Sequence, residues 1–237
     1  MSGIFKFKQF NVDQSGCAMK INTDGVLLGV LAEANNPQTI LDIGTGTGVI
    51  ALMLAQRFNE AHIYAVEIDP IAAKTAEKNF INSPFSEKLS IYPIGFEQFF
   101  DQHLGKKYDM IISNPPFFIN SLKSPKAKKE LAKHTDEDFF KRLVNTLSKH
   151  LTIAGLGYLI LPLETAELVK NIALENSLFV RKIISIYSYK DYAPHREILV
   201  LSPHKTNVDN EQFVIYDEPK VYSKQYQGSL KDFFTIF

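Results

Sequence analysis

Cysteine is almost absent from this chain of 237 residues, because Cys17 is the only one. A single thiol excludes an internal disulfide and a metal site built from several thiolates. The six histidines include no spaced pair of the type that binds zinc, so we expect no metal. A protein without disulfides suits a reducing compartment, and the expected location is the cytoplasm.

The chain also lacks a long apolar run and a net charge. No apolar segment is long enough to cross a bilayer, and residues 1–10 lack the apolar stretch of a signal peptide, so we expect no membrane association. Basic and acidic residues number 26 each, which leaves a local basic patch as the means of attracting nucleic acid. Nothing in the sequence points to a stable protein partner. With 45% hydrophobic residues, the chain can bury the core of one large domain.

From residue 39 onward, short β-like segments alternate with longer helical segments. Strands are expected over 39–43, 62–68, 89–94, 108–113 and 157–162, and helices over 48–58, 70–83, 97–103, 136–149 and 165–176. Because parallel strands need crossover helices, this order predicts an α/β fold with a mostly parallel central sheet and helices on both faces. The segments 179–189 and 196–203 should form an antiparallel strand pair at the C-terminal end of the sheet, because their link is too short for a helix. The whole chain, 1–237, is expected to be one domain with a short N-terminal extension over about 1–38.

Three glycines, Gly44, Gly46 and Gly48, lie between the first expected strand and its helix. Glycine permits a tight turn there and lets a ligand approach the free amides of the helix N-terminus. The spacing is G-x-G-x-G, whereas the dinucleotide fingerprint is G-x-G-x-x-G. An NAD-dependent oxidoreductase is therefore disfavoured, and a tight turn without a ligand is the simplest alternative.

Two acidic residues accompany the glycine loop. Asp42 precedes the first glycine by two residues, and its carboxylate would repel a diphosphate but attract a cationic ligand. Glu67 ends the second expected strand, where an acidic side chain can accept hydrogen bonds from both hydroxyls of a ribose. A nucleoside that carries an ammonium and a sulfonium matches this set, and S-adenosylmethionine is such a molecule.

The expected strand 108–113 runs directly into the sequence NPPFF, residues 114–118. Proline cannot donate to a sheet ladder, so the strand must stop there. In order, LDIGTGTG, AVEIDP and NPPF resemble the class I S-adenosylmethionine-dependent methyltransferases that act on amino nitrogens. FKQF, CAMKINTDGVLLG, NSPF and PHR narrow the resemblance to the bacterial tRNA1(Val) adenine N6-methyltransferases. The resemblance covers nearly the whole chain and implies a Rossmann-like methyltransferase fold.

The resemblance implies that the methyl group goes to N6 of the adenine 3′ of the anticodon, position 37 of tRNA1(Val). The Asn114 side-chain oxygen and the Pro115 carbonyl would accept the hydrogens of that amine, and Pro116 would stiffen the turn. Phe117 would stack on the flipped base, whereas Phe118 is expected in the core. A protein glutamine amide, ribosomal RNA or DNA are alternative substrates, and a regulator without catalysis is the alternative of another class.

Cofactor contacts are implied for nine positions: Thr23, Asp42, Gly44, Gly46, Gly48, Glu67, Ile68, Phe96 and Asn114. Thr23 and Asp24 fit two roles equally well, closure over the methionine end or capping of a first helix, with Asp24 as the N-cap. Many relatives place an acid after the third strand to bind the adenine amino group, but this chain has Gly95 there. Phe96 is expected to pack on the adenine, and whether Glu97 reaches the amino group is open.

RNA contacts are expected from basic residues outside these motifs. The segment 121–134 is rich in lysine and follows the aromatic pair, and a solvated loop or frayed helix is its simplest interpretation. The candidates are Lys126, Lys128, Lys129, His195 and Arg196. For the last two, a loop with solvated charges at a strand end is equally compatible with the sequence.

Overall fold

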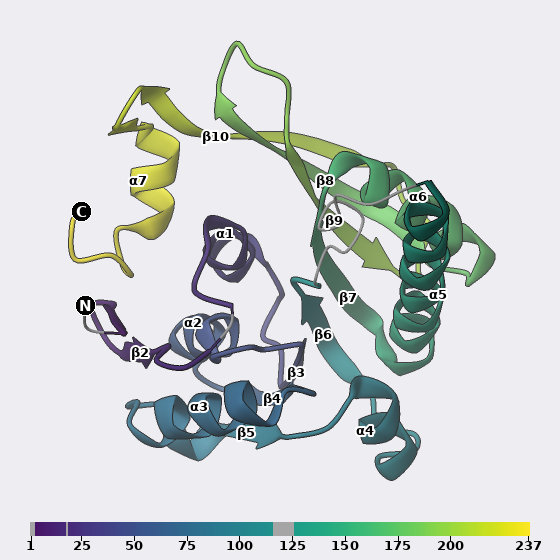
Figure 1. The fold of residues 1–237 in the computed structure, drawn as a ribbon, viewed down its shortest axis with the longest axis horizontal. Coiled ribbons are helices and arrows are strands. Elements are labelled where there is room, and N and C mark those ends of the chain that lie inside the picture. The colour runs from purple at the N-terminus through teal and green to yellow at the C-terminus, as the bar shows by residue number, and fades with distance from the viewer. Residues whose placement is uncertain (1–2, 18, 116–125) are drawn as a thin grey trace.

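The computed structural model describes residues 3–17, 19–115 and 126–237, with only the backbone described for 126–136. A nine-stranded sheet crosses the molecule (Figure 1). From one edge to the other its strands are β11 (Val221–Tyr222), β10 (Asp209–Glu218), β8 (Phe179–Tyr189), β9 (Arg196–Ser202), β7 (Leu151–Leu161), β6 (Tyr108–Ser113), β3 (Thr39–Ile43), β4 (His62–Val66) and β5 (Leu89–Tyr92). β5, β4, β3, β6 and β7 are parallel neighbours, as the alternation of strands and helices predicts.

Helices cover both faces of this sheet (Figure 1). One face carries α1 (Thr23–Leu31), α2 (Val49–Arg57), α3 (Pro70–Ile81) and α7 (Lys224–Leu230), and the other α4 (Phe96–Gln102), α5 (Lys126–His150) and α6 (Leu163–Glu175). A short 3₁₀ helix, η1 (Ser86–Lys88), precedes β5. Successive side chains of β6 point to opposite faces, so Met110 and Ile112 join one buried cluster and Ile111 the other. No described helix has the length and hydropathy needed to span a membrane.

The C-terminal part of the sheet contains more strands than the sequence analysis expected. β8 and β9 form the antiparallel pair that was predicted. β10 then adds to β8 in parallel and β11 pairs with β10, so the predicted pair lies inside the sheet and not at its edge. β7 begins six residues before its expected start, at Leu151, and pairs there with Tyr108.

Helix α5 begins at Lys126, ten residues before the expected start. The intervening sequence, KAKKELAKHT, contains no glycine or proline and is rich in good helix formers, which explains the longer helix. In the sequence analysis this segment was interpreted by its charge, and its helical propensity was given too little weight. The three candidate RNA-binding lysines of this segment therefore lie on a helix, and nothing is described of their side chains.

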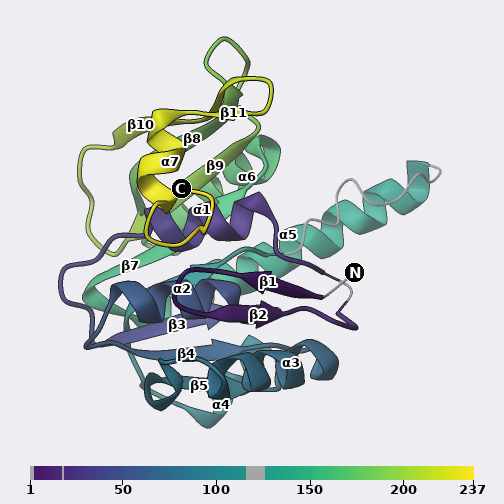
Figure 2. The same cartoon turned by 90° about the vertical axis from the view of Figure 1, so that its left-hand side faces the viewer.

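The N-terminal residues form a hairpin that the sequence analysis missed. Its strands, β1 (Ile4–Lys6) and β2 (Asn11–Asp13), are antiparallel. Phe7 forms an isolated bridge with Phe234, and the Lys8 amide donates to the Phe233 carbonyl over 2.7 Å. Figure 2 shows the C-terminal segment and α7 lying over α1 beside this hairpin. The two ends of the chain thus build one face of the molecule together, and the division into a domain and an N-terminal extension stays a prediction.

Candidate active site

The predicted site motifs meet at the carboxyl ends of the parallel strands, the usual ligand position in open α/β sheets. The glycine loop follows β3, Glu67 follows β4, and Asn114 follows β6. Two adjoining cavities of about 330 and 480 Å³ lie there. They share four lining residues, Met19, Gly44, Asn114 and Pro115. We call the two together the glycine-loop cleft.

The three glycines of the loop are required for different reasons. All have positive φ angles, 71° at Gly44, 59° at Gly46 and 88° at Gly48. A Cβ on Gly48 would lie 2.4 Å from Cε1 of Phe80, whereas Gly44 and Gly46 have no heavy atom within 4 Å of that position. Gly44 and Gly46 line the cleft. Gly48 is thus demanded by backbone conformation and packing, and Gly44 and Gly46 leave the surface of the cleft open to a ligand.

Glu67 holds the loop through both of its carboxylate oxygens. Oε2 accepts from the Gly46 amide and Oε1 from the Asp69 amide, each over 2.8 Å. The side chain is only 8% exposed but lines the larger cavity. Because each carboxylate oxygen has two lone pairs, each keeps one acceptor position for a further donor. The geometry therefore fits an acceptor for two ribose hydroxyls.

Asp42 lies behind the loop and does not line the cleft. It is completely buried, and Oδ2 accepts from the Thr45 hydroxyl over 2.6 Å. Oδ1 has no hydrogen-bond partner in the described part of the chain. Burial is the main reason why the pKa of Asp42 rises to about 7; the Thr45 hydrogen bond opposes the rise, and the charge of Glu67 adds to it. The expected attraction for a cationic ligand would have to act through the loop.

The far end of the larger cavity contains residues that follow β4 and β5. Ile68, Phe96 and Glu97 line it together with two residues that the sequence analysis missed, Phe139 and Arg142. The Glu97 carboxylate accepts from Nε of Arg142 over 3.0 Å, and the Phe96 ring meets Phe139 edge-on. Glu97 therefore reaches the cavity although it follows Gly95 by two residues. Arg142 escaped notice because it lies on α5, 45 residues away.

Asn114 faces an asparagine from the N-terminus of α1. Its Nδ2 lies 3.5 Å from Oδ1 of Asn22, and the same oxygen accepts from the Gly25 amide over 2.9 Å. Because Oδ1 of Asn22 serves as the helix cap, Asn114 must turn its nitrogen toward it. Oδ1 of Asn114 has no hydrogen-bond partner among the residues described around it, and is left to accept from a ligand in the cleft.

The predicted N-cap of α1, Asp24, is wrong, because Asn22 occupies that position. The carboxylate of Asp24 accepts instead from Nε of Arg196 over 2.9 Å, which joins α1 to β9. Asparagine and aspartate cap helices about equally well, so the sequence could not choose between them. Thr23 does not line the glycine-loop cleft and borders a neighbouring cavity.

Of the remaining predicted site residues, Pro115 lies in the cleft, and the others lie away from it or outside the described residues. Arg196 is bound to Asp24 and to the carbonyl of His195, and burial lowers the pKa of His195. Pro116, Phe117 and Phe118 lie outside the residues that the structure describes. Pro115, the second predicted acceptor, lines both cavities.

Comparison with known proteins matches residues 20–152 to the methyltransferase small domain family. A tRNA1(Val) (adenine(37)-N6)-methyltransferase from Pedobacter heparinus is 44% identical over all of this chain and all of its own length. One from Flavobacterium psychrophilum is 39% identical over 98% of this chain and 99% of that protein.

Solved structures of lower identity show the fold alone. A predicted O-methyltransferase from Agrobacterium tumefaciens, 13% identical, has a TM-score of 0.64 over 88% of this chain and 95% of that one. TrmN from Thermus thermophilus, 20% identical, has a TM-score of 0.55 over 75% of this chain and 47% of its own. The Rossmann-like methyltransferase fold that the motifs imply is thereby confirmed.

Proposed function

Because the chain belongs to the tRNA1(Val) (adenine(37)-N6)-methyltransferase family, we propose that it transfers a methyl group from S-adenosylmethionine to N6 of adenine 37 in tRNA1(Val). The observation that carries the proposal is the position of Asn114 and Pro115 in the cleft, where Glu67 and the glycine loop also lie. Pro115 is the last described residue of this motif. The stacking role of Phe117 remains part of the proposal.

The residues of the cleft fit the cofactor at each part of the nucleoside. When bound, S-adenosylmethionine supplies an electrophilic methyl group on a sulfonium. The two free acceptor positions of Glu67 would bind the ribose hydroxyls, and Gly44 and Gly46 would let the ligand approach the backbone. At the far end, Glu97 would accept from the adenine amino group while Arg142 holds its carboxylate in place. Glu97 would then take the role of the acid that many relatives have after the third strand, where this chain has Gly95.

Asn114 and Pro115 act on the nitrogen that is methylated. An exocyclic amine is a poor nucleophile because its lone pair is delocalised into the aromatic ring. Two acceptors that bind its hydrogens favour a pyramidal nitrogen whose lone pair is free to attack. Oδ1 of Asn114 and the carbonyl of Pro115 would be those acceptors, held in place before the substrate arrives. Asn22 contributes as a positioning residue, because it binds the nitrogen of Asn114 and not its oxygen.

Single-turnover methylation of defined RNAs tests the proposed substrate. Purified protein and labelled S-adenosylmethionine would be incubated with tRNA1(Val) that carries adenine or guanine at position 37, and with an unrelated tRNA. We expect N6-methyladenosine only in the first RNA, identified by nuclease digestion and mass spectrometry. Equal methylation of the guanine variant would place the target elsewhere, and methylation of protein glutamine instead of RNA would favour the alternative enzyme class.

A further inference from the structure

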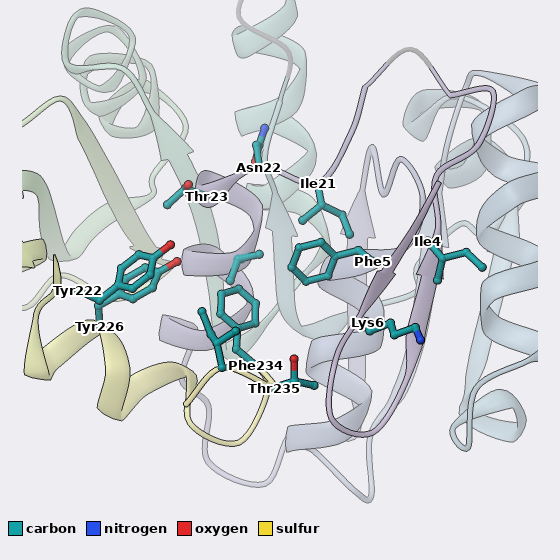
Figure 3. Close-up of a pocket in the computed structure, with 12 residues that line it drawn as sticks. Ile4, Phe5, Lys6, Ile21, Asn22, Thr23, Tyr222, Tyr226, Phe234 and Thr235 are labelled. Carbon is teal, nitrogen blue, oxygen red and sulfur yellow. The ribbon is translucent and has the colours of Figure 1, made fainter. Parts of the chain in front are cut away.

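A second cavity of about 550 Å³ lies beside the glycine-loop cleft, and nothing in the proposed reaction uses it. It lies between the N-terminal hairpin, the start of α1 and the C-terminal segment (Figure 3). Ile21 and Asn22 line this cavity and the cleft, so these two residues form the wall between them. We call it the terminal cavity. Its volume falls within the usual range of small-molecule pockets, about 300–1,000 Å³.

Aromatic rings form two opposite walls of the terminal cavity. Phe5 projects from β1 on one side, and Tyr222 and Tyr226 lie opposite (Figure 3). The two tyrosine rings stack on each other, with centroids 4.6 Å apart and planes 8° apart. Their hydroxyl groups point toward the cavity in this view. Because Tyr222 also stacks on Tyr216, the tyrosines present their hydroxyl-bearing edges to the cavity, and Phe5 supplies the ring on the opposite side. An aromatic ring facing a row of hydrogen-bonding groups suits a planar heterocycle better than an aliphatic or a highly charged ligand.

The polar groups of the cavity can read the edge of such a ring. Thr23 and the two tyrosine hydroxyls both donate and accept hydrogen bonds. A tyrosine phenol is protonated at physiological pH, and burial raises the pKa of Tyr226 further, so its hydroxyl keeps its donor. At the rim, the apolar side chains of Ile4 and Ile236 are 48% and 67% exposed. Exposed apolar side chains around an aromatic pocket are typical of a surface that a partner covers.

The position of the cavity indicates which heterocycle it binds. Asn22 borders the cavity and also contacts the proposed catalytic Asn114, so a base here would lie next to the target base. Lys20 lines the cleft and Lys6 lines the terminal cavity, one lysine on each side of the dividing wall. Neither forms an ion pair within the described part of the chain. The Lys6 side chain leaves β1 on the side opposite to Phe5 (Figure 3), so its ammonium can meet a phosphate outside the cavity, and Lys20 can meet one at the cleft.

We propose that the terminal cavity binds the base of the nucleotide adjacent to the target adenine, splayed out of the anticodon loop. This inference rests on the proposed function, because it takes the RNA as substrate and the cleft as the place of the target base. Sequence-specific RNA recognition commonly uses unstacked loop bases held by aromatic side chains, with hydrogen bonds to their edges. The cavity would therefore select the loop that surrounds the target and help to pull two successive bases apart.

The test combines changes in the RNA and in the protein. Anticodon hairpins of tRNA1(Val) would carry an abasic nucleotide immediately 5′ or 3′ of the target adenine. For the wild-type protein, we expect one of the two to lower kcat/KM about tenfold, since one base–aromatic contact is lost. Tyr222→Ala should lower kcat/KM on the intact hairpin by a similar factor. For this variant, kcat/KM should then differ little between the intact hairpin and the hairpin with that abasic site. Thr23→Val, which keeps its shape and lies on the surface, should weaken discrimination between bases at the same position.

The matched control is Tyr192→Ala, because Tyr192 is 66% exposed on the link between β8 and β9 and lines none of these cavities. It should behave as the wild type with every hairpin. Tyr222→Ala and Tyr192→Ala should bind S-adenosylhomocysteine with wild-type affinity in calorimetry. If Tyr222→Ala does not fold, Tyr222→Phe and Thr23→Val carry the test, because both preserve the packing.

A binding measurement separates this inference from the proposed function. With 2-aminopurine at the sensitive flanking position, its fluorescence should change when the wild-type protein binds and not when Tyr222→Ala binds. If this difference is seen but no hairpin or tRNA is methylated, the proposed function fails and the cavity assignment stands. If the wild-type protein has the same kcat/KM on both abasic hairpins as on the intact hairpin, the inference is overturned. Weakened S-adenosylhomocysteine binding by Tyr222→Ala would overturn it too, because the cavity would then belong to the cofactor.

Discussion

Replacing Glu67 with glutamine separates its two assigned roles, holding the glycine loop and binding the ribose. The carboxylate accepts two amide hydrogens, each over 2.8 Å, and a hydrogen bond to a charged group contributes about 1.5–3 kcal/mol. Glutamine keeps one oxygen and turns an NH2 group toward the other amide. One charge-assisted bond is lost and the second becomes neutral, so we expect the free energy of unfolding to fall by about 2–4 kcal/mol.

Cofactor binding should fall independently of this loss of stability. The carboxamide has fewer acceptor positions for the ribose, and the loss of one strong hydrogen bond corresponds to about ten- to hundredfold weaker binding. Calorimetry with S-adenosylhomocysteine would measure the affinity, and urea denaturation without ligand would measure the stability. Asp69→Asn is the matched control, because it removes a neighbouring carboxylate while asparagine still caps α3. That variant should differ from the wild type by no more than about 0.5 kcal/mol in stability.

A ligand that lacks one ribose hydroxyl would show whether Glu67 binds the ribose directly. Removing the 2′- or 3′-hydroxyl should cost the wild-type protein more affinity than it costs Glu67→Gln, as in a double-mutant cycle. Equal costs in both proteins would refute the ribose assignment. Wild-type stability of Glu67→Gln would refute the role in holding the loop, whatever happens to binding.

Three further substitutions test other parts of the site. Asn114→Ala should slow single-turnover methylation by about 10²–10³-fold with little change in S-adenosylhomocysteine affinity, and turnover within a few-fold of wild type would exclude the nitrogen-activating role. Gly48→Ala should destabilise the fold by more than about 2 kcal/mol, since its Cβ would lie 2.4 Å from Phe80 at a φ of 88°; a urea midpoint near wild type would contradict this. Asp42→Asn should become more stable relative to wild type as pH rises from about 4 to 7. The pKa of Asp42 is about 7 in the folded protein and 3.8 in the unfolded chain, so between these values the unfolded chain loses the proton while the folded protein keeps it. The free energy of unfolding of the wild type therefore falls by up to about 1.4 kcal/mol per pH unit over that range. Parallel stability–pH curves for the two proteins would show that the carboxyl is not buried uncharged.

The sequence by itself determined the parallel half of the sheet and the approximate place of the ligand. Strands β3, β4, β5 and β6 and their helices were predicted within a few residues, because local hydrophobic periodicity and the punctuation by glycine and proline specify them. The glycine loop and Glu67 could be placed at one edge because the carboxyl ends of parallel strands meet there. Asn114 and Pro115 follow from the same rule once the fourth of these strands is recognised.

Contacts between distant residues were decided only by the tertiary structure. Asp24 was predicted as the cap of α1, but it binds Arg196, 172 residues away, and Asn22 caps the helix instead. The pairing of Glu97 with Arg142 required α5 to pack on the same face of the sheet as α4. In both cases, the partner of a charged or polar group depends on which elements pack together, and propensity does not contain that information.

The terminal cavity is the clearest case of this kind. Its walls come from residues 4–6, 21–26, 222–226 and 234–236, so no motif within a single segment could predict the cavity. Each of those stretches reads locally as a strand, a cap, a helix or a tail with ordinary aromatic content. The cavity exists because the bridge between Phe7 and Phe234 holds the two ends of the chain together over α1. Local sequence determines which elements form, whereas the space left between elements that are far apart in sequence is determined by how they pack.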